Sequence, residues 1–382
     1  SIAPAEDERP EDRVFLSGAR ALQRTHPEIS VFGDVLAGLW LGERVYAGED
    51  ERSGIPLRAV GLHMQSVLDP YSLTKVAFHC SPDPEHPIDL EEAYITWFGL
   101  VPSLSLTVGR FRQQLGVLNR WHEHDLDHTT YPLALEGLLG EEGLVGNGLA
   151  VKWFMPPLWA HANELSFEVV EGDNETLFSG RHFTIPVGLV HQKSYWDLSD
   201  STYLELGLSG MAGANNARGR LETAEQAKAR GADPEADGYV AQLVDDPWRS
   251  TVVAGADLTI AWNPPREARY RSFTWRTEGY WVSRELPDGS RDNGWGGYSY
   301  VHAQLAPLWF AGLRGDLMAP VEGEDGTEDL IWRVVPSVTF WQSEFVYLRL
   351  EYWYTRGLGS EWEHRALLQI DWAAGPHKHE KY

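Results

Sequence analysis

The sequence contains a single cysteine, no long apolar run, and far fewer basic than acidic residues. Cys80 is alone, so no intrachain disulfide can form and thiol chemistry has no second cysteine. No stretch approaches the roughly 18 consecutive apolar residues of a transmembrane helix. The formal charge of −24 argues against nucleic-acid binding, because that affinity comes largely from lysine and arginine on phosphates.

The motifs of common enzyme classes are missing as well. There is no GxSxG, no P-loop, no dinucleotide-binding glycine pattern, and no spacing of Ser, His and Asp that singles out a triad. We therefore predict neither an enzyme nor a resident cofactor. The chain opens SIAPAEDERPEDR, without the apolar core of a signal peptide. If the protein is exported, we expect Ser1 to lie at or after a cleavage site.

Tryptophan, tyrosine and glycine are abundant, with 17, 15 and 37 residues among 382. Tryptophan and tyrosine concentrate at membrane–water interfaces, where an amphipathic ring suits both sides. Apolar residues make up 43% of the chain, which is typical of a folded protein. Strands of a membrane barrel alternate in polarity and score low in hydropathy windows, so this composition is compatible with a membrane β-barrel.

From Ser30 onward, apolar residues recur with a period of two. Near the C-terminus, Val346, Leu348 and Leu350 fall on one face, and Arg349 and Glu351 fall on the other. This alternation is typical of half-buried strands. About sixteen strands of roughly ten residues are predicted, near residues 30–41, 56–68, 71–80, 88–98, 103–112, 147–156, 163–170, 182–195, 201–211, 250–262, 269–283, 295–305, 308–318, 329–341, 345–356 and 363–372.

The predicted connections alternate between short and long. Short turns fall at 69–71, 101–103 and 306–307, while the long insertions are 112–146 and 212–249. Outer-membrane barrels have short periplasmic turns and longer outside loops. The pattern predicts an all-β fold, a closed antiparallel transmembrane β-barrel of about 16 strands. The alternative is a soluble pair of sandwiches or a propeller, but a propeller needs a repeat of about forty residues that we do not find.

The predicted barrel occupies residues 30–382, and residues 1–29 are expected to form an N-terminal periplasmic extension. Residues 88–116, IDLEEAYITWFGLVPSLSLTVGRFRQQLG, contain an acidic-Ala-Tyr step, a short turn and a Gly-basic-Phe strand end. The matching residues are Glu92, Ala93 and Tyr94, then Gly109, Arg110 and Phe111. This segment resembles the strand–turn–strand core of phosphate-selective porin O/P-like outer-membrane proteins. Residues 118–153 resemble related outer-membrane channels. The lysine-rich phosphate site of the name-giving porins has no counterpart, so phosphate selectivity is not expected.

The resemblance implies that residues 112–146 are the outside loop that folds into sixteen-stranded porins and narrows the channel. The loop is rich in carboxylates, and a ring of charged side chains biases which ions pass through a narrow pore. We expect these residues to form a negative rim: Glu123, Asp125, Asp127, Glu136, Glu141 and Glu142.

Five arginines of the C-terminal half fall on the inward face of the predicted strands: Arg276, Arg314, Arg333, Arg349 and Arg365. Opposite an acidic loop, they would create a transverse field across the constriction. Alternatively, each arginine pairs with a nearby lumen carboxylate, from the set Glu278, Asp316, Glu351 and Asp371. Both arrangements can hold together, as a mixed network.

The run HEHDLDH, residues 122–128, is a candidate metal site. His122, His124 and His128 offer imidazoles near Asp127, and zinc or a similar divalent ion takes such ligands. The run superficially resembles the HxHxDH of metallo-β-lactamases. One extra residue separates its second histidine from the aspartate, so hydrolase chemistry is not predicted. The alternative is a polar loop tip packed against the lumen.

Together these features predict a porin-like channel in the bacterial outer membrane of a Gram-negative-type envelope. It would contact membrane lipid and pass small hydrophilic solutes or ions by passive diffusion, alone or as a homo-oligomer. Two alternatives stay open. One is a sheath or docking barrel for a partner protein, such as an electron-carrying cytochrome or a surface lipoprotein. The other is metal uptake through the His122–His128 loop.

Overall fold

The computed structural model of the chain describes most of the predicted barrel. The described residues are 27–42, 54–80, 88–172, 174, 176–178, 186–215, 220–221, 224–234, 243–244, 249–265, 267, 270–286, 289–321, 330–357 and 362–375. Residues 1–26, most of the predicted extension, lie outside this set, as does the tail after Gly375. The first strand begins at Glu28, two residues before the predicted boundary.

The described chain is almost entirely β-structure. Its strands are β1 (Glu28–Gly42), β2 (Leu57–Asp69), β3 (Ser72–Cys80), β4 (Asp89–Phe98), β5 (Leu104–Arg112), β6 (Val145–Met155), β7 (Ala162–Val170), β8 (Val187–Ser199), β9 (Thr202–Ala214), β10 (Arg220–Leu221), β11 (Leu243–Val244), β12 (Ser250–Trp262), β13 (Ser272–Glu285), β14 (Arg291–Ala306), β15 (Trp309–Ala319), β16 (Ile331–Ser343), β17 (Val346–Gly357) and β18 (Trp362–Ala374). The helices are two 3₁₀ turns, η1 (Leu118–Arg120) and η2 (Glu123–Asp125), and two α-helices, α3 (Leu133–Leu139) and α4 (Ala224–Ala229). None of the described helices is long and apolar enough to cross a membrane.

Sixteen of the described strands form one closed antiparallel barrel, and the prediction of that fold is confirmed. Each strand pairs with its neighbours along the chain, except that β9 pairs with β12 across the long 215–249 insertion. The barrel closes where β1 pairs with β18, from Val31 opposite Ala374 to Gly42 opposite Glu363. Closure pairs every strand on both sides, so no open edge is exposed.

Because side chains alternate along a strand, each strand places one set of residues in the lumen and the other on the outer surface. On β17, Arg349, Glu351 and Trp353 are buried inside the barrel, whereas Leu350 and Tyr352 are exposed on its outer surface. The outer face is therefore apolar and the lumen is polar, the arrangement of a barrel that contacts lipid on its outside.

Aromatic side chains collect at both ends of this apolar outer face. Trp332, Tyr354 and Trp362 pack together next to the long loops, with ring centroids 4.2–5.6 Å apart. Next to the short turns, Trp309 packs against Phe340 at 4.8 Å. Such girdles mark the two membrane–water interfaces of transmembrane barrels.

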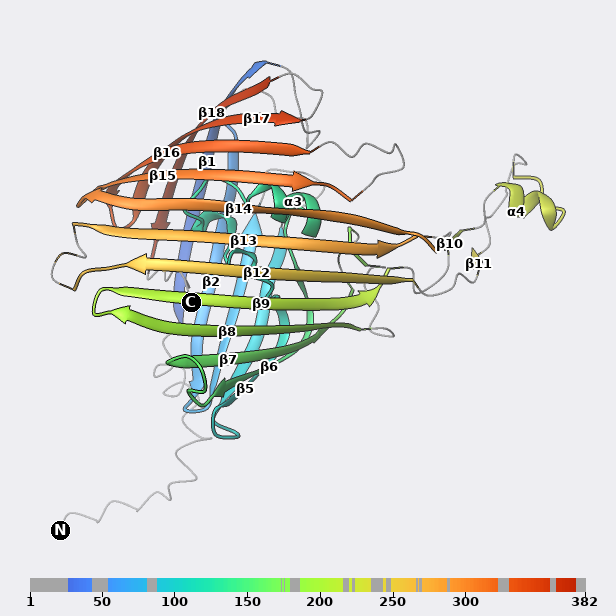
Figure 1. Ribbon diagram of the computed structural model, residues 1–382, viewed down its shortest axis with the longest axis horizontal. Coiled ribbons are helices and arrows are strands. Elements are labelled where there is room, and N and C mark those ends of the chain that lie inside the picture. The colour runs from blue at the N-terminus through green and yellow to red at the C-terminus, as the bar shows by residue number, and fades with distance from the viewer. Residues whose placement is uncertain are drawn as a thin grey trace, which may run out of the picture.

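The two longest connections, 113–144 and 215–249, leave the same end of the barrel, as the sequence predicts, although the link between β12 and β13 at the other end is also longer than a turn. Short turns join β8 to β9, β14 to β15 and β16 to β17 at the left in Figure 1. The two longest connections lie at the opposite end. There α4 and the two-stranded sheet of β10 and β11 extend beyond the barrel, whereas α3 lies inside the ring of strands (Figure 1).

Most predicted strand ends fall within a few residues of those observed. Two described strand ends differ by four residues: β8 ends at Ser199 rather than 195, and β14 begins at Arg291 rather than 295, where Arg291 continues the ladder opposite Glu285. The strand predicted at 182–195 begins at Val187 in the structure, and residues 182–185 lie outside the described set.

Candidate functional site: the constriction inside the barrel

Residues 113–144 leave β5 and turn into the lumen. Gly116 makes the entry possible, because its φ of +67° lies in the left-handed region that favours glycine. A Cβ at this position would also collide with the carboxylate of Glu278 on β13. From here to Leu144 most side chains are buried, so this loop is a packed part of the interior rather than a surface segment.

The second half of the loop packs through apolar contacts. Helix α3 lies against β13, β14 and β15, and its Leu133, Leu135 and Leu138 are fully buried. They join a cluster that includes Val282 and Met318 of the wall. Full burial of one leucine contributes about 2 kcal/mol, so this cluster is a substantial source of loop stability.

Buried wall carboxylates hold the loop backbone. Glu278 accepts the backbone N–H groups of Val117 and Leu118 at 3.1 and 3.0 Å. Glu351 on β17 accepts the N–H of Thr129 at 3.0 Å and its hydroxyl at 2.6 Å. These backbone groups belong to irregular chain that lacks its own ladder, so the wall supplies the hydrogen bonds that burial requires.

All five predicted arginines lie inside the barrel, and each is only 0–7% exposed. Two of them bind loop carbonyls. Arg314 donates to Thr130 O at 2.9 Å and also pairs with Asp316 at 3.1 Å. Arg349 donates to Leu126 O at 2.9 Å and to Gln369 at 3.0 Å.

The other three arginines stack on aromatic rings. Arg276 lies 4.5 Å over Trp121 of the loop. Arg333 and Arg365 lie 4.0 and 4.9 Å from the ring of Trp353. Guanidinium groups stack favourably in this way because the ring face is negative. The arginines therefore clamp the loop and the adjacent wall, and little of their surface contacts open solvent.

The six predicted acidic residues are dispersed rather than gathered at one edge. In the first half of the loop, Glu123 pairs with Arg58 of β2 at 2.8 Å, and Asp127 accepts from Tyr300 at 3.0 Å. Asp125 is buried beside His124. Glu136 is half-buried on α3, while Glu141 and Glu142 are exposed at the end of the loop.

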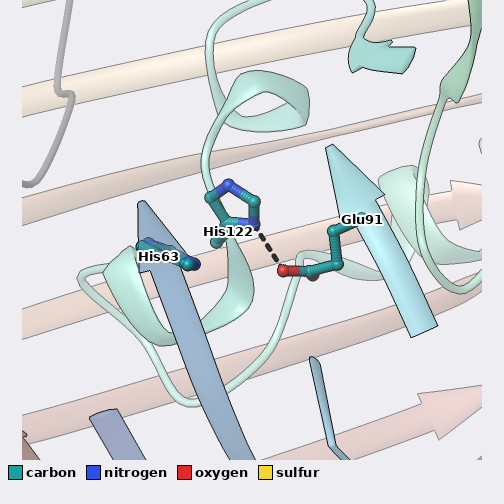
Figure 2. Close-up of side chains that lie close together, drawn as sticks. All are labelled: His63, Glu91 and His122. Carbon is teal, nitrogen blue, oxygen red and sulfur yellow. Dashed lines mark ion pairs between the residues drawn. The ribbon is translucent and has the colours of Figure 1, made fainter. Parts of the chain in front are cut away.

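His122 lies between two carboxylates of β4. Its Nδ1 is 2.9 Å from Glu91 Oε2, and its Nε2 is 2.9 Å from Glu92 Oε2. Figure 2 shows the Glu91 carboxylate directed at the His122 ring, with His63 of β2 on the other side. Burial alone would lower the pKa of His122, but the two carboxylates outweigh it and raise the pKa to about 9.

A β-bulge brings these consecutive carboxylates together. The pairing of β3 with β4 shifts between Ala77 and Phe78, which lie opposite Glu92 and Leu90, so Glu91 is the extra residue. Neighbours on a regular strand face opposite sides, and a bulge re-aims one of them. A second bulge re-aims Arg58 in the same way, toward Asp34 and the loop.

Of the other two histidines of the predicted metal run, His124 lies beside this group, with its ring centroid 5.6 Å from that of His122, and His128 lies elsewhere. His124 stacks on Phe32 of β1, with ring centroids 3.5 Å apart. His128 lies 3.5 Å from Glu351 and packs edge-on against Tyr300. Among the described residues, the side chains that do converge as metal ligands are His63, Glu91 and His122. The structure thus brings His122 to ligand atoms on the wall; His124 packs beside them without joining the set, and His128 lies apart.

A polar cavity of about 220 Å³ lies on the other side of the loop. Its wall is formed by β3–β7, and Gln114 and Arg120 of the loop border it. Lys152 and Glu164 form an ion pair of 2.9 Å beside it, with side chains 27% and 18% exposed. Both charged side chains are more accessible than the buried arginines of the opposite side, which are 0–7% exposed.

Sequence reasoning missed His63, Glu91, Lys152 and Glu164 as site residues. The alternation of β6 and β7 places Lys152 and Glu164 inward, and that signal was available. His63 and Glu91 carried no such signal, because their meeting with His122 depends on a bulge and on the path of the loop.

No protein-family model matches the sequence. An uncharacterized protein of Aquifex aeolicus (strain VF5) is 32% identical over 137 residues, which are 36% of this chain and 28% of that protein. The chain thus spans little more than a quarter of that relative's length.

Solved outer-membrane proteins share the fold over nearly the whole chain. The anion-selective porin from Comamonas acidovorans covers 91% of this chain and 100% of its own, with a TM-score of 0.54 and 11% identity. The channel DcaP of Acinetobacter baumannii covers 92% and 97%, with a TM-score of 0.55 and 10% identity. OmpT of Vibrio cholerae covers 91% and 98%, at 0.53 and 8%. At such low identity the likeness shows the fold alone, that of an outer-membrane porin barrel, and membership of the phosphate-selective O/P-like family stays a prediction.

Proposed function

We propose that this protein is a porin-like channel of the bacterial outer membrane that passes small hydrophilic solutes or ions by passive diffusion. The proposal rests on the cavity between residues 113–144, the constriction loop, and the wall formed by β3–β7. This cavity is the described part of the constriction that combines space, polar walls and accessible charge. A water-filled, charge-lined passage of this kind needs no cofactor and no catalytic step.

The two sides of the constriction differ in free space, and this difference supports a solute path along the β3–β7 wall. On the β13–β17 side, α3 packs against the barrel and the arginines are almost fully buried, so little space is left for solute. On the β3–β7 side, Ser105, Thr107 and Ser166 line the cavity together with Lys152. Hydroxyl and charged groups replace part of the hydration shell of a passing solute.

The occupied lumen favours a channel over the alternative of a sheath around a partner protein. The loop crosses the lumen between Glu278 on β13 and Glu92 on β4, which are seven strands apart around the ring of sixteen. A cytochrome inserted into the barrel would need this space. Displacing the loop would break its charged hydrogen bonds, each worth about 1.5–3 kcal/mol.

The experiment places a large side chain in the cavity and measures single-channel conductance in planar bilayers. Ala150 faces the cavity from β6, and we expect Ala150→Trp to reduce conductance by at least about half, because ion flux follows the free cross-section. The matched control is Ala256→Trp, on the exposed outer face of β12, which should leave conductance unchanged.

Both variants should show the slower gel migration on boiling that marks a folded barrel. Equal conductance for Ala150→Trp and the wild-type protein would place the path elsewhere. A purified wild-type barrel with no conductance at all would contradict the channel proposal.

A further inference from the structure

Three side chains from separate segments meet where the constriction loop crosses the wall. His63 lies on β2, Glu91 on β4 and His122 between the two 3₁₀ turns of the loop. One ligand atom from each lies within 4.8 Å of the other two (Figure 2). Zinc bonds of about 2.0 Å in tetrahedral geometry put ligand atoms about 3.3 Å apart, so small side-chain rotations would close this set around one ion.

The ring of His122 already has the orientation of a metal-binding histidine. Such a residue usually donates its second N–H to a carboxylate, which fixes the ring and the tautomer. Here Nε2 of His122 is 2.9 Å from Glu92, and Lys75 holds the same Glu92 oxygen at 3.0 Å. When a metal ion displaces the proton on Nδ1, the Nδ1 lone pair and Glu91 Oε2 both face that ion.

The contact between His122 and Glu91 is a buried ion pair. Nδ1 of His122 and Oε2 of Glu91 are 2.9 Å apart, and the His122 side chain is only 3% exposed. A divalent cation bound by both atoms would take the place of the Nδ1 proton between them and would keep a positive charge beside the buried Glu91 carboxylate.

The second oxygen of Glu91 is engaged elsewhere, which leaves Oε2 for the ion. Oε1 lies 3.4 Å from Arg112 and 3.9 Å from His79. The His63 ring completes the set from the opposite side, with its centroid 4.9 Å from that of His122. Two imidazoles and one carboxylate are a donor set that suits zinc and neighbouring divalent transition ions.

We propose that His63, Glu91 and His122 bind one divalent transition-metal ion of the zinc class, with solvent as the fourth ligand. Because His122 belongs to the loop and the other two belong to the barrel, the ion fastens the first half of the loop to β2 and β4. Glu92, which orients His122, also lines the cavity. The ion thus lies beside the constriction, where its occupancy sets how firmly the loop is held.

Zinc titration of the chelator-treated, full-length barrel in detergent tests the site by calorimetry. We expect one ion per chain. His63→Gln and Glu91→Gln should each weaken binding by at least about tenfold, since each removes a direct ligand. The matched controls are His124→Gln and His128→Gln, which remove loop histidines outside the set and should leave zinc affinity within about threefold of the wild-type value.

Several results would overturn the proposal. One is the absence of zinc binding by the wild-type barrel, and another is unchanged affinity in both His63→Gln and Glu91→Gln. Loss of binding in His128→Gln but not in His63→Gln would assign the ion to the loop histidines alone. Heat-dependent gel migration confirms that each variant is a folded barrel.

X-ray absorption of the zinc-loaded wild-type protein tests the ligand set without any substitution. We expect two imidazole nitrogens and light oxygen ligands at about 2.0–2.2 Å. A spectrum without imidazole scattering would overturn the assignment even if zinc binds. Single-channel recordings with zinc and with chelator then test the fastening of the loop, and zinc should reduce spontaneous closures.

Discussion

Two long insertions leave the same end of the barrel and reach opposite positions. Residues 113–144 fold inward and pack across the lumen, whereas the 215–249 insertion carries α4 and the β10–β11 sheet beyond the barrel (Figure 1). Similar length and the same point of departure therefore do not determine where a loop goes. The difference lies in what each insertion can bury.

The inward loop buries apolar side chains, and carboxylates of the barrel wall accept hydrogen bonds from its backbone. Leu118, Leu133 and Leu138 are at most 1% exposed, and Glu278 and Glu351 bind its N–H groups. In α4, AEQAKA offers only small, polar or charged side chains. A helix that can bury little apolar surface cannot offset the entropy of ordering it, so α4 has little to gain from packing in the lumen.

Deleting each insertion gives the largest expected contrast. Removing residues 117–139 joins Gly116 to Gly140 and takes out the packed constriction, so we expect single-channel conductance to rise at least about twofold. Removing residues 220–242, a deletion of equal length, should change conductance little because its described elements, β10 and α4, lie outside the lumen (Figure 1). If the outer deletion has the larger effect, the outer insertion rather than the inner loop controls passage.

Removing one wall anchor should cost more stability than removing an accessible ion pair. Glu351→Ala leaves the buried N–H and hydroxyl of Thr129, and the indole N–H of Trp353 at 2.9 Å, without their acceptor. We expect a loss of about 3 kcal/mol in the free energy of unfolding by urea, followed by tryptophan fluorescence. Glu164→Ala, which breaks the partly exposed pair with Lys152, should cost less than about 1 kcal/mol. Equal losses of unfolding free energy in the two variants would show that the Glu351 anchor contributes no more to stability than the Lys152–Glu164 ion pair.

The stability of the barrel should also depend on pH through His128 of the inward loop. Burial, followed by Arg314, lowers its pKa to about 4, although Glu351 and Asp127 oppose the shift; Tyr300 packs on its ring. Between pH 6.5 and 4 the unfolded chain binds a proton that the folded chain does not, so stability falls as the pH falls through this window. From pH 7 to pH 5 the wild-type protein should lose about 2 kcal/mol more than His128→Gln. Identical urea midpoint shifts in both proteins would contradict this assignment.

The local period of two was enough to predict the fold, because each strand of a barrel repeats the same requirement of apolar outside and polar inside. The same rule placed Arg314, Arg333 and Arg349 in the lumen. It said nothing of whether those guanidinium groups meet water or protein, which depends on the path of a loop distant in sequence. The resemblance predicted an inward loop, and the structure has one.

The histidine run shows where sequence proximity misleads. His122 and His128 are six positions apart, but they contact different parts of the wall, at Glu91 on β4 and at Glu351 on β17. The partners His63 and Glu91 could not be predicted, because a one-residue bulge decides that Glu91 points inward.

The smallest expected effect concerns charge selectivity, and it separates the two sides of the constriction. Arg349 is 3% exposed and its guanidinium is committed to Leu126 O and Gln369, so it has little contact with passing ions. Lys152 borders the cavity, and its removal leaves the Glu164 carboxylate unopposed there.

We expect Lys152→Gln to shift the bilayer reversal potential under a salt gradient toward cation selectivity, and Arg349→Gln to shift it less. Both substitutions remove one positive charge, so the comparison isolates position. The field of a charge in a narrow, poorly solvated passage is strong, whereas a charge more than about 8 Å from the path is screened at physiological salt. A larger shift for Arg349→Gln would make the five lumen arginines the selectivity element. It would also move the path to the β13–β17 side, where the loop would then have to open.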